Sequence, residues 1–464
     1  MLRVHPVSSS ASPFRGNIGL AHVDITPPVG IFARNWGAAK HDTGQSIHRP
    51  LRLSALAISS DSGDSLLMID ADLGFWTTLT TFELLQSCVL RELGLRSDQF
   101  LFALTHTHAS PHLSDPQPGW EGGEILRAWL EDLTAATIQA GRAAMGASEP
   151  ALLEWHWGKC QLAAPRDLPD PDSETPRIVC GYNPTAVGDD TLLLGRITTQ
   201  AGFLKALIVN YACHPTTLAW DNTSVSPDFI GAMRETLTRN TTVPAFFLQG
   251  ASGELAPRWQ YVGDPAVADQ HGRQLAYAAL ATLEDMSPPG TRLMYQGVVE
   301  SGAPLAVWKP LPVQASNVLS SVQGAAVLPL KNWPTTEELD REFRACPDRA
   351  LAERLRRKRN IRAVLGDGTT WELPVYAWRL GDAIIVGSMA EAYSDFQTEI
   401  RQAFPDHHVT CLNVVNGSIG YLCPEDRYDL DVYQAWQSPF DRGSLQIFIA
   451  EVRRLVHSLL HPVL

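Results

Sequence analysis

Several features are scarce or missing in this sequence, and each absence excludes a class of protein. The seven cysteines are scattered along 464 residues and include no C-x-x-C pair, so neither a disulfide framework nor a structural zinc knuckle is predicted. No apolar run approaches the roughly 18 residues of a transmembrane helix. Positive charge is also scarce, because 37 Lys and Arg residues oppose 50 Asp and Glu residues, for a formal net charge of −13. This balance argues against binding nucleic acid or an anionic membrane surface through bulk charge.

No secretory signal peptide is predicted either, because the first residues contain no apolar core. Residues 1–16 are polar, contain serine and proline, and are expected to form a flexible N-terminus. From the missing signal peptide and the scattered cysteines we expect a reduced, cytoplasmic location. No interdomain linker, internal repeat or low-complexity segment divides the rest of the chain. Residues 17–464 are therefore expected to form one large α/β domain.

Short apolar runs alternate with helical patterns along the chain. Helices are predicted at 79–93 and 124–145, where apolar residues recur every three or four positions. The charged, periodic segment 335–363 is predicted to be an exposed helix, and the Pro- and Asp-rich segment 162–190 to be an irregular loop. Strands are predicted at 53–59, 65–72, 99–104, 203–212, 244–249, 383–387 and 408–415.

Several of these strands end in a short loop that carries a histidine, a carboxylate or a tyrosine. In open α/β sheets, ligands bind outside the carboxyl ends of the strands. We therefore expect the polar residues at these ends to point into one cleft. They are Asp72, His106, His108, His214, Glu254, Glu391 and Tyr421.

Three of the 14 histidines crowd the end of the strand at 99–104, in the stretch THTHASPH. His106 and His108 are two positions apart, so in an extended chain their side chains face the same side. They could share a metal, or one could bind the metal while the other serves the substrate; alternatively, one caps the strand and the other is a core or surface histidine. The stretch departs from the H-x-H-x-D-H metal motif, because Ser110 replaces the aspartate and the third histidine is His112. An amidohydrolase barrel would carry H-x-H on its first strand, whereas here H-x-H follows about a hundred residues of chain.

Two further candidate ligands stand alone in the sequence. His214 ends a strand in NYACHPTTL, where Pro215 fixes the turn. Glu391, in SMAEAYSDF, is predicted to begin an amphipathic helix. The structural alternatives are a core histidine and a carboxylate that balances the helix dipole. A zinc hydrolase needs about three protein ligands and a position for water, and His106, His214 and Glu391 would supply the ligands.

Taken in order, the motifs resemble the neutral/alkaline (non-lysosomal) ceramidase family, in its N-terminal catalytic domain and along nearly the whole chain. They are GLAHVDITPPVG, THTHASPH, NYACHPTTL, SPDFIGAMRE, GASGELAP, AEAYSDF and GYLCPEDRYDLDVY. Each motif is weak alone, but seven in the same order indicate homology. The resemblance implies a mixed β-sheet core flanked by helices. It also implies hydrolysis of the C–N amide bond of a small-molecule N-acyl substrate, ceramide-like and possibly a lipid.

A metal site follows from the resemblance. It implies that His106, His214, Glu391 and Tyr421 bind Zn²⁺. A tyrosine ligand is unusual, which makes the match more specific. The chemistry would be attack by a metal-activated water on the amide carbonyl.

The resemblance also implies three catalytic residues. His108 would lie beside the metal and help to stabilise the oxyanion. Tyr433, twelve residues after Tyr421, would form a hydrogen bond near the scissile amide. Arg166, in APRDLPDPD, would be the active-site arginine of the family.

The sequence departs from the family in two respects. Ala256 occupies the position of the family's serine in G-D-V-S-P, so a serine nucleophile at that position is impossible. The family's C-terminal β-sandwich domain is expected to be absent, because the sequence ends at Leu464. Two alternatives to an amide hydrolase therefore stay open. One is a zinc esterase or lactonase on the same scaffold, and the other is a non-catalytic relative that binds zinc and a ligand.

Overall fold

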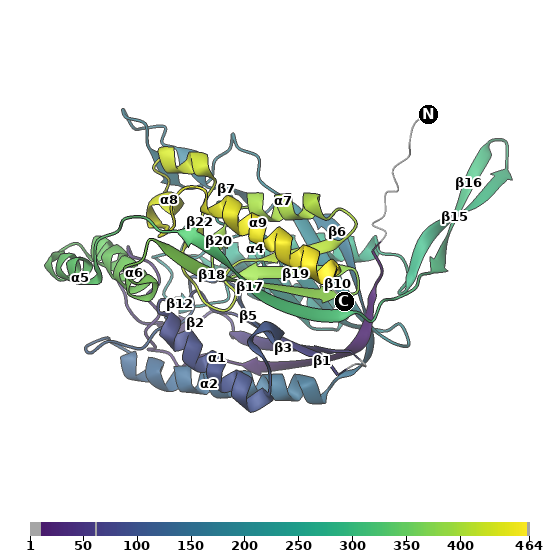
Figure 1. The fold of residues 1–464 in the computed structure, drawn as a ribbon, viewed down its shortest axis with the longest axis horizontal. Helices are drawn as coiled ribbons and strands as arrows, with labels where there is room; N and C mark the ends of the chain where they lie inside the picture. The colour runs from purple at the N-terminus through teal and green to yellow at the C-terminus, as the bar shows by residue number, and fades with distance from the viewer. Residues whose placement is uncertain (1–10, 61–62, 462–464) are drawn as a thin grey trace.

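Two β-sheets lie face to face in the middle of the molecule, and helices cover both outer sides (Figure 1). The computed structural model describes residues 11–60 and 63–461. Between the sheets lies a core to which both contribute, with Leu56 and Leu101 on one side and Trp378 and Ile385 on the other. The molecule is thus a four-layer, mixed α/β domain, and the fold class predicted from the sequence is confirmed.

The larger sheet has eight strands and mixes parallel with antiparallel pairs. β4 and β5 are parallel, as are β11 and β13, and the other neighbours are antiparallel. In spatial order the strands are β13 (Ala245–Gln249), β11 (Leu204–Tyr211), β10 (Thr191–Thr199), β6 (Glu149–Lys159), β1 (Phe14–Asp24), β3 (Arg52–Ser59), β4 (Ser65–Ala71) and β5 (Phe100–Leu104).

The smaller sheet has four strands, and β19 lies inside it. Every residue of β19 is buried, because one face packs on the larger sheet and the other on helices, so its apolar run shows no alternation. In spatial order the strands are β17 (Leu319–Pro329), β18 (Thr370–Leu380), β19 (Ala383–Ser388) and β21 (His408–Leu412).

Three pairs of helices cover the sheets, each through an apolar face. The first pair packs on the β1–β3–β4–β5 part of the larger sheet, the second on β10, β11 and β13, and the third on the smaller sheet. They are α1 (Leu79–Leu93) with α2 (Gly123–Gly146), α3 (Phe229–Thr241) with α4 (Pro265–Glu284), and α7 (Asp395–Ala403) with α9 (Ser444–Leu460).

Short elements connect these layers, and one pair of strands stands apart. The hairpin of β15 (Thr291–Glu300) and β16 (Pro304–Pro312) projects away from the body of the molecule (Figure 1). The remaining elements are β2 (Ser46–Ile47), β7 (Ala163–Pro165), β8 (Asp167–Pro169), β9 (Ile178–Cys180), β12 (Ser224–Val225), β14 (Leu255–Pro257), β20 (Glu391–Ala392), β22 (Tyr421–Leu422), α5 (Thr336–Ala345), α6 (Arg349–Leu365), α8 (Tyr433–Gln437) and the 3-10 turns Ser97–Gln99 and Glu425–Asp429.

The larger sheet is strongly curved, so that its two edges meet. β13 contacts β4 and β5, and the Phe247 amide donates a hydrogen bond of 3.0 Å to Asp70 Oδ2. Arg234 of α3 binds the same carboxylate and its neighbour, because Nη2 lies 2.6 Å from Asp70 Oδ2 and Nη1 lies 2.5 Å from Asp72 Oδ1. All three charged side chains are buried. When the strand directions are followed from one neighbour to the next across the sheet, β5 and β11 run in opposite directions. The curvature of the sheet therefore allows their carboxyl ends to converge.

Four sequence-based expectations need correction. The predicted helix at 335–363 is two helices, separated at Cys346–Asp348, and the second buries Glu353 and Arg356 rather than standing exposed. Glu391 does not begin a helix, since it belongs to β20 and α7 starts at Asp395. Residues 162–190 contain three short strands. β1 begins at Phe14, so residues 14–16 of the expected flexible N-terminus are in a strand, whereas residues 1–10 lie outside the described residues.

The closure of the sheet predicts a large stability effect at Arg234. Arg234→Met should lower the free energy of unfolding by about 3–5 kcal/mol, because it leaves Asp70 and Asp72 buried without a counter-charge. Urea denaturation followed by circular dichroism measures this change. Arg239→Met, at an exposed position of the same helix, is the control and should change little. Equal stability of the two variants would show that the buried ion cluster does not hold the sheet closed.

Candidate metal centre

His106 lies just beyond the carboxyl end of β5, in an unusual backbone conformation. Its φ is 72°, which few non-glycine residues adopt. Two hydrogen bonds hold it there: its amide donates to Leu73 O at 2.8 Å, and its ring Nδ1 lies 2.9 Å from Gly74 O. Since a carbonyl oxygen only accepts, Nδ1 carries a proton, and Nε2 is the nitrogen that is left for a metal to bind. Strained backbone of this kind is concentrated at functional sites.

His214 follows β11 and is anchored in the same manner. Its amide donates to Leu255 O at 2.8 Å, and its ring Nδ1 lies 2.9 Å from Ser252 O. Nδ1 is therefore the protonated nitrogen, and Nε2 is free to bind a metal. Burial, with the nearby charge of Arg166, lowers the pKa of His214 to about 3, so the ring is neutral at physiological pH, as a metal ligand must be.

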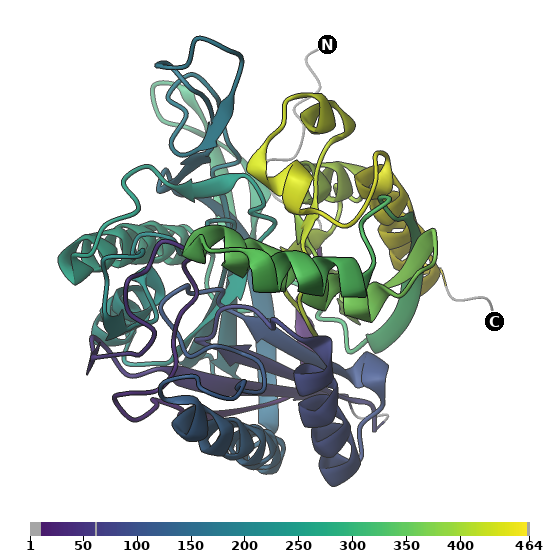
Figure 2. The ribbon, with the colours of Figure 1, turned by 90° about the vertical axis from the view of Figure 1, so that its left-hand side faces the viewer.

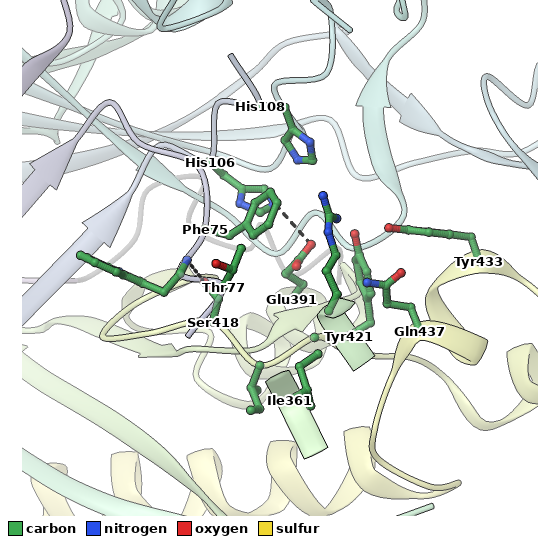
Figure 3. A pocket seen from close by; sticks show the side chains of 14 residues that line it. Phe75, Thr77, His106, His108, Ile361, Glu391, Ser418, Tyr421, Tyr433 and Gln437 are labelled. Carbon is green, nitrogen blue, oxygen red and sulfur yellow. Dashed lines mark hydrogen bonds and ion pairs between the residues drawn. The ribbon is translucent and has the colours of Figure 1, made fainter. Parts of the chain in front are cut away.

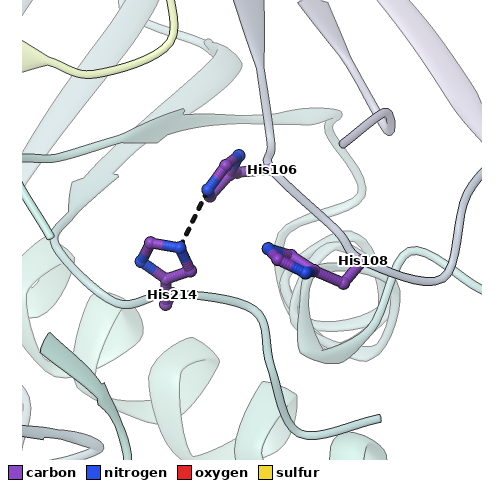
Figure 4. Close-up of side chains that lie close together, drawn as sticks. All are labelled: His106, His108 and His214. Carbon is purple, nitrogen blue, oxygen red and sulfur yellow. Dashed lines mark hydrogen bonds between the residues drawn. The ribbon is translucent and has the colours of Figure 1, made fainter. Parts of the chain in front are cut away.

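Three electron-rich atoms converge at this point. His106 Nε2 lies 2.9 Å from His214 Nε2, and Glu391 Oε2 lies 3.2 Å and 3.4 Å from the two nitrogens (Figures 3 and 4). With both Nδ1 atoms protonated, the lone pairs of two neutral rings would face one another, an arrangement that repels unless a cation or a proton lies between the two Nε2 atoms. Ligands of a tetrahedral zinc, at about 2.0–2.1 Å from the metal, are about 3.3 Å apart. The donor set and its spacing fit a divalent metal ion.

Glu391 and Tyr421 are brought together by a short parallel pairing of β20 with β22, in which the two residues are direct partners. Burial would raise the pKa of Glu391, but its interactions with the rings of His106 and His214 outweigh burial and lower the pKa well below its usual value. Glu391 is thus a carboxylate. Burial, and then the charge of Glu391, raise the pKa of Tyr421 well above 10. Without a metal, Tyr421 keeps its proton.

His108 supplies a third imidazole next to the first two. One ring nitrogen from each of His106, His108 and His214 lies within 4.8 Å of the others, a grouping that could hold a metal ion (Figure 4). Neither ring nitrogen of His108 has a hydrogen-bond partner, although both are buried. The ring packs between Trp36 and Phe75, with centroid distances of 5.0 Å and 5.3 Å. A buried polar group without a partner indicates a position that a metal or a substrate completes.

Arg166, between β7 and β8, and Tyr433, at the start of α8, reach the same region. Arg166 is buried and donates from Nη2 to Gly253 O at 2.8 Å and to Tyr421 Oη at 3.3 Å. The ring of Tyr433 lies 5.8 Å from that of Tyr421. Tyr433 lines the cavity directly, whereas Arg166 contacts it through Tyr421. The structure therefore brings together all seven residues singled out by the resemblance.

A cavity opens onto the metal-type cluster (Figure 3). Sequence reasoning missed several of its lining residues, most notably Phe75, Gln437 and Arg357 of α6. Arg357 could not be recognised from the sequence, because it lies in a run of charged residues that is typical of a solvent-exposed helix face. Conversely, Asp72 and Glu254 were expected in the cleft, and neither lines the cavity. Asp72 pairs with Arg234 instead.

The fold is that of solved ceramidases. The structure described as a ceramidase complexed with C2 matches with a TM-score of 0.66 and 14% sequence identity, over 97% of this chain and 76% of that chain. Neutral ceramidase from Pseudomonas aeruginosa matches with a TM-score of 0.63 and 15% identity, over 97% and 74% of the two chains. No protein-family model and no curated protein sequence matches this chain. The resemblance seen in the sequence is thus confirmed at the level of the fold.

In the part of the chain that the structure describes, we find no helix with both the length and the apolar character needed to cross a membrane.

The anchoring of the two histidines predicts how metal content responds to mutation. His214→Ala should lose bound zinc, because it removes one of the converging lone pairs, whereas His108→Ala should retain zinc if His108 faces the substrate. Elemental analysis of purified protein gives the zinc content per chain, and His457→Ala, at an exposed position, is the control. Full zinc in His214→Ala would contradict the ligand assignment, and loss of zinc in His108→Ala would make His108 a ligand.

Glu254 predicts a pH-dependent stability. Ser394 donates to its carboxylate from the amide, at 3.1 Å and 3.0 Å to the two oxygens, and from the hydroxyl. Burial raises the pKa of Glu254 from 4.5 to about 8. The folded state therefore holds a proton that the unfolded chain releases, and stability falls as pH rises through this window.

Glu254→Gln removes this titration. Its free energy of unfolding should match that of the wild type near pH 4 and exceed it by an amount on the order of 3 kcal/mol at pH 8. Urea denaturation across this pH range measures the difference. Glu284→Gln, at an exposed position of α4, is the control, and a Glu254→Gln curve parallel to that of the wild type would contradict the raised pKa.

Proposed function

We propose that this protein is a zinc-dependent hydrolase that cleaves the C–N amide bond of an N-acyl substrate. The observation that carries the proposal is the convergence of two imidazole nitrogens and one carboxylate oxygen, within 3.4 Å, beside a cavity. The fold likeness to ceramidases supports the reaction class. The substrate would be a small N-acyl compound, ceramide-like or another lipid amide.

In this proposal His106, His214, Glu391 and Tyr421 hold the zinc ion. Bound zinc supplies polarisation of the amide carbonyl and a lowered pKa for the attacking water. The neutral ring of His214 and the ionised carboxylate of Glu391 are already in the protonation states that binding requires. Arg166 acts as a positioning residue, because its guanidinium donates to Tyr421 Oη and orients that side chain. Zinc is the metal proposed, although His and Glu ligands accept other divalent ions.

His108 and Tyr433 would act on the substrate itself. Burial lowers the pKa of His108 well below 6.5, so its ring is neutral and can donate one hydrogen bond to the developing oxyanion. Burial raises the pKa of Tyr433 above 10, so its hydroxyl keeps a proton to donate near the scissile amide. Such donors, fixed before the reaction, stabilise charge that develops in the transition state.

The nucleophile in this proposal is water. Ala256 is buried in β14, is 1% exposed, and is not among the residues that line the cavity. It carries no hydroxyl that could attack the carbonyl. Water attack needs only a bound metal and a group that receives the proton, and the Glu391 carboxylate and the neutral His108 both lie at the cavity wall.

The proposal predicts that Glu391 matters for both metal and rate. Glu391→Gln should weaken zinc binding and lower kcat/KM for amide hydrolysis at least 100-fold, roughly the upper end of what changes around metal ligands cost. Activity would be followed by release of the free amine from N-acyl amides, with matched esters in parallel. Glu372→Gln, at an exposed position of β18, is the control.

Two results would count against the proposal. An unchanged rate in Glu391→Gln would remove Glu391 from the mechanism. Hydrolysis of the esters alone would change the reaction class to that of an esterase, while bound zinc without hydrolysis of either series would make the protein a non-catalytic binder. Chelation that abolishes amide hydrolysis, with recovery on addition of zinc, supports the proposal.

A further inference from the structure

α6 concentrates positive charge beside the cavity of an acidic protein. Its 17 residues contain seven cationic side chains and one acidic one, in a chain whose net charge is −13. α5 and α6 cross the front of the view in Figure 2, and α6 contributes Arg357 and Ile361 to the cavity wall. Several of the cations are neutralised locally, for example Arg349 by Asp42 and Arg359 by Asp340. Two others, Arg356 and Arg357, have only one carboxylate between them.

Arg356 and Arg357 share a single buried carboxylate. Glu353 accepts from Arg356 Nη2 at 2.8 Å and from Arg357 Nε at 3.0 Å. Glu353 and Arg356 are each 7% exposed and Arg357 is 17% exposed at their side chains. Two cations with one anion leave one positive charge in excess, and a charge held away from water is costly unless it is paired. The excess charge therefore suits a monoanion.

Arg357 presents that charge to the cavity in a fixed orientation. Nη2 donates to Asn35 O at 2.6 Å, Nε binds Glu353, and the guanidinium carbon lies 4.9 Å from the centre of the Phe75 ring. Nη1 has no partner among the described residues. A guanidinium that is oriented in advance loses little entropy when it binds an anion. Planar recognition of carboxylate is the role in which arginine exceeds lysine.

The distance from Arg357 to the metal cluster is short. The Phe75 ring that it covers lies 5.3 Å from the ring of His108 and 5.9 Å from that of His106. Arg357 is also among the charges that lower the pKa of His108. Only one aromatic ring therefore lies between the free guanidinium edge and the histidines. An anion bound at Arg357 must be attached to the substrate within a few bonds of the amide that the metal engages.

We propose that Arg357 is an anchor for a substrate carboxylate, so that the preferred substrates are N-acyl amino acids, with the carboxylate on the carbon next to the amide nitrogen. This inference rests on the proposed amide hydrolysis and specifies its substrate class. A neutral N-acyl amine would leave the excess charge of Arg357 unpaired. The single excess charge and the single free nitrogen favour a carboxylate over a doubly charged phosphate.

The test compares substrates that differ only in charge. N-hexanoylglycine and N-hexanoylethanolamine share the acyl chain and the amide, but only the first carries a carboxylate. The zinc-loaded wild type should show a higher kcat/KM for the acid. In Arg357→Gln the ratio of acid to neutral kcat/KM should fall roughly 10- to 100-fold, mainly through KM, because one charge-assisted hydrogen bond is lost. Arg357→Lys should recover part of that ratio.

A matched control separates direct binding from the general charge of α6. Arg354 is exposed on the same helix, with its guanidinium over Trp436 at 4.4 Å. Arg354→Gln removes the same charge without touching the cavity and should leave the ratio unchanged. An equal fall in both variants would mean that long-range attraction, rather than an anchor at Arg357, selects the acid, and this would overturn the proposal.

Binding and turnover are measured separately, so that failure of the two proposals can be told apart. Calorimetric titration with N-hexanoylglycine should show binding that weakens in Arg357→Gln. Such binding without hydrolysis of either amide supports the anion site and refutes the hydrolase. Hydrolysis of both amides with equal kcat/KM in the wild type, or a ratio that Arg357→Gln does not change, overturns the anion site and leaves the hydrolase intact.

Discussion

The curvature of the larger sheet is the constraint on which the candidate site depends. His106 follows β5 and His214 follows β11, and these strands run in opposite directions near opposite edges of the sheet. In a flat sheet their carboxyl ends would lie far apart. The buried contacts of Arg234 with Asp70 and Asp72 join the edges, and only then do the two imidazoles meet. The metal-type centre is thus a consequence of sheet closure, and a buried ion cluster that does not line the cavity secures its geometry.

Holding the candidate ligands His106, His214 and Glu391 together without a cation is unfavourable. His106 adopts a positive φ, two Nε2 lone pairs face each other at 2.9 Å, and a carboxylate lies beside them. The surrounding carbonyls of Gly74 and Ser252 fix the tautomers that produce this repulsion. A bound dication would make the close approach of the two Nε2 atoms and the carboxylate favourable. Metal binding and the stability of the folded state would therefore be coupled. The fold spends stability to hold the ligands ready, as preorganised sites do.

Much of the converging cluster of side chains could be predicted from the sequence, because short polar loops after apolar strands mark where a sheet places its functional side chains. His106, His108 and His214 satisfied that rule. Glu391 was a candidate for the wrong structural reason. It was assigned to a helix terminus, and its position depends on the pairing of β20 with β22 through Tyr421. That pairing is a contact between distant segments, which no local pattern encodes.

The same limit applies more strongly to residues that line the cavity. Asp72 obeyed the strand-end rule and yet serves the closure of the sheet, because its partner, Arg234, lies on a helix far along the chain. Arg357 lies on a helix and not after a strand, so the strand-end rule could not identify it. The spacing of Glu353 and Arg357 is typical of an exposed ion pair on a helix face, and only the docking of α6 against Asn35 turns it into a wall of the cavity. Helical periodicity reveals a helix but not the surface on which it packs.

The two sources of site residues have different consequences for function. The candidate metal ligands come from loops after sheet strands and from the short β20–β22 pair, in a fold shared with the ceramidases at 14–15% identity. The cationic part of the cavity wall, which is Arg357, comes from α6, a helix outside both sheets. A shared fold alone fixes neither the chemistry nor the substrate, and substrate recognition depends on the segments that surround the scaffold. A buried arginine in excess of its carboxylate partner is a poor match for a neutral lipid amide. The cationic wall therefore argues for an anionic substrate on a scaffold that this chain shares with solved ceramidases.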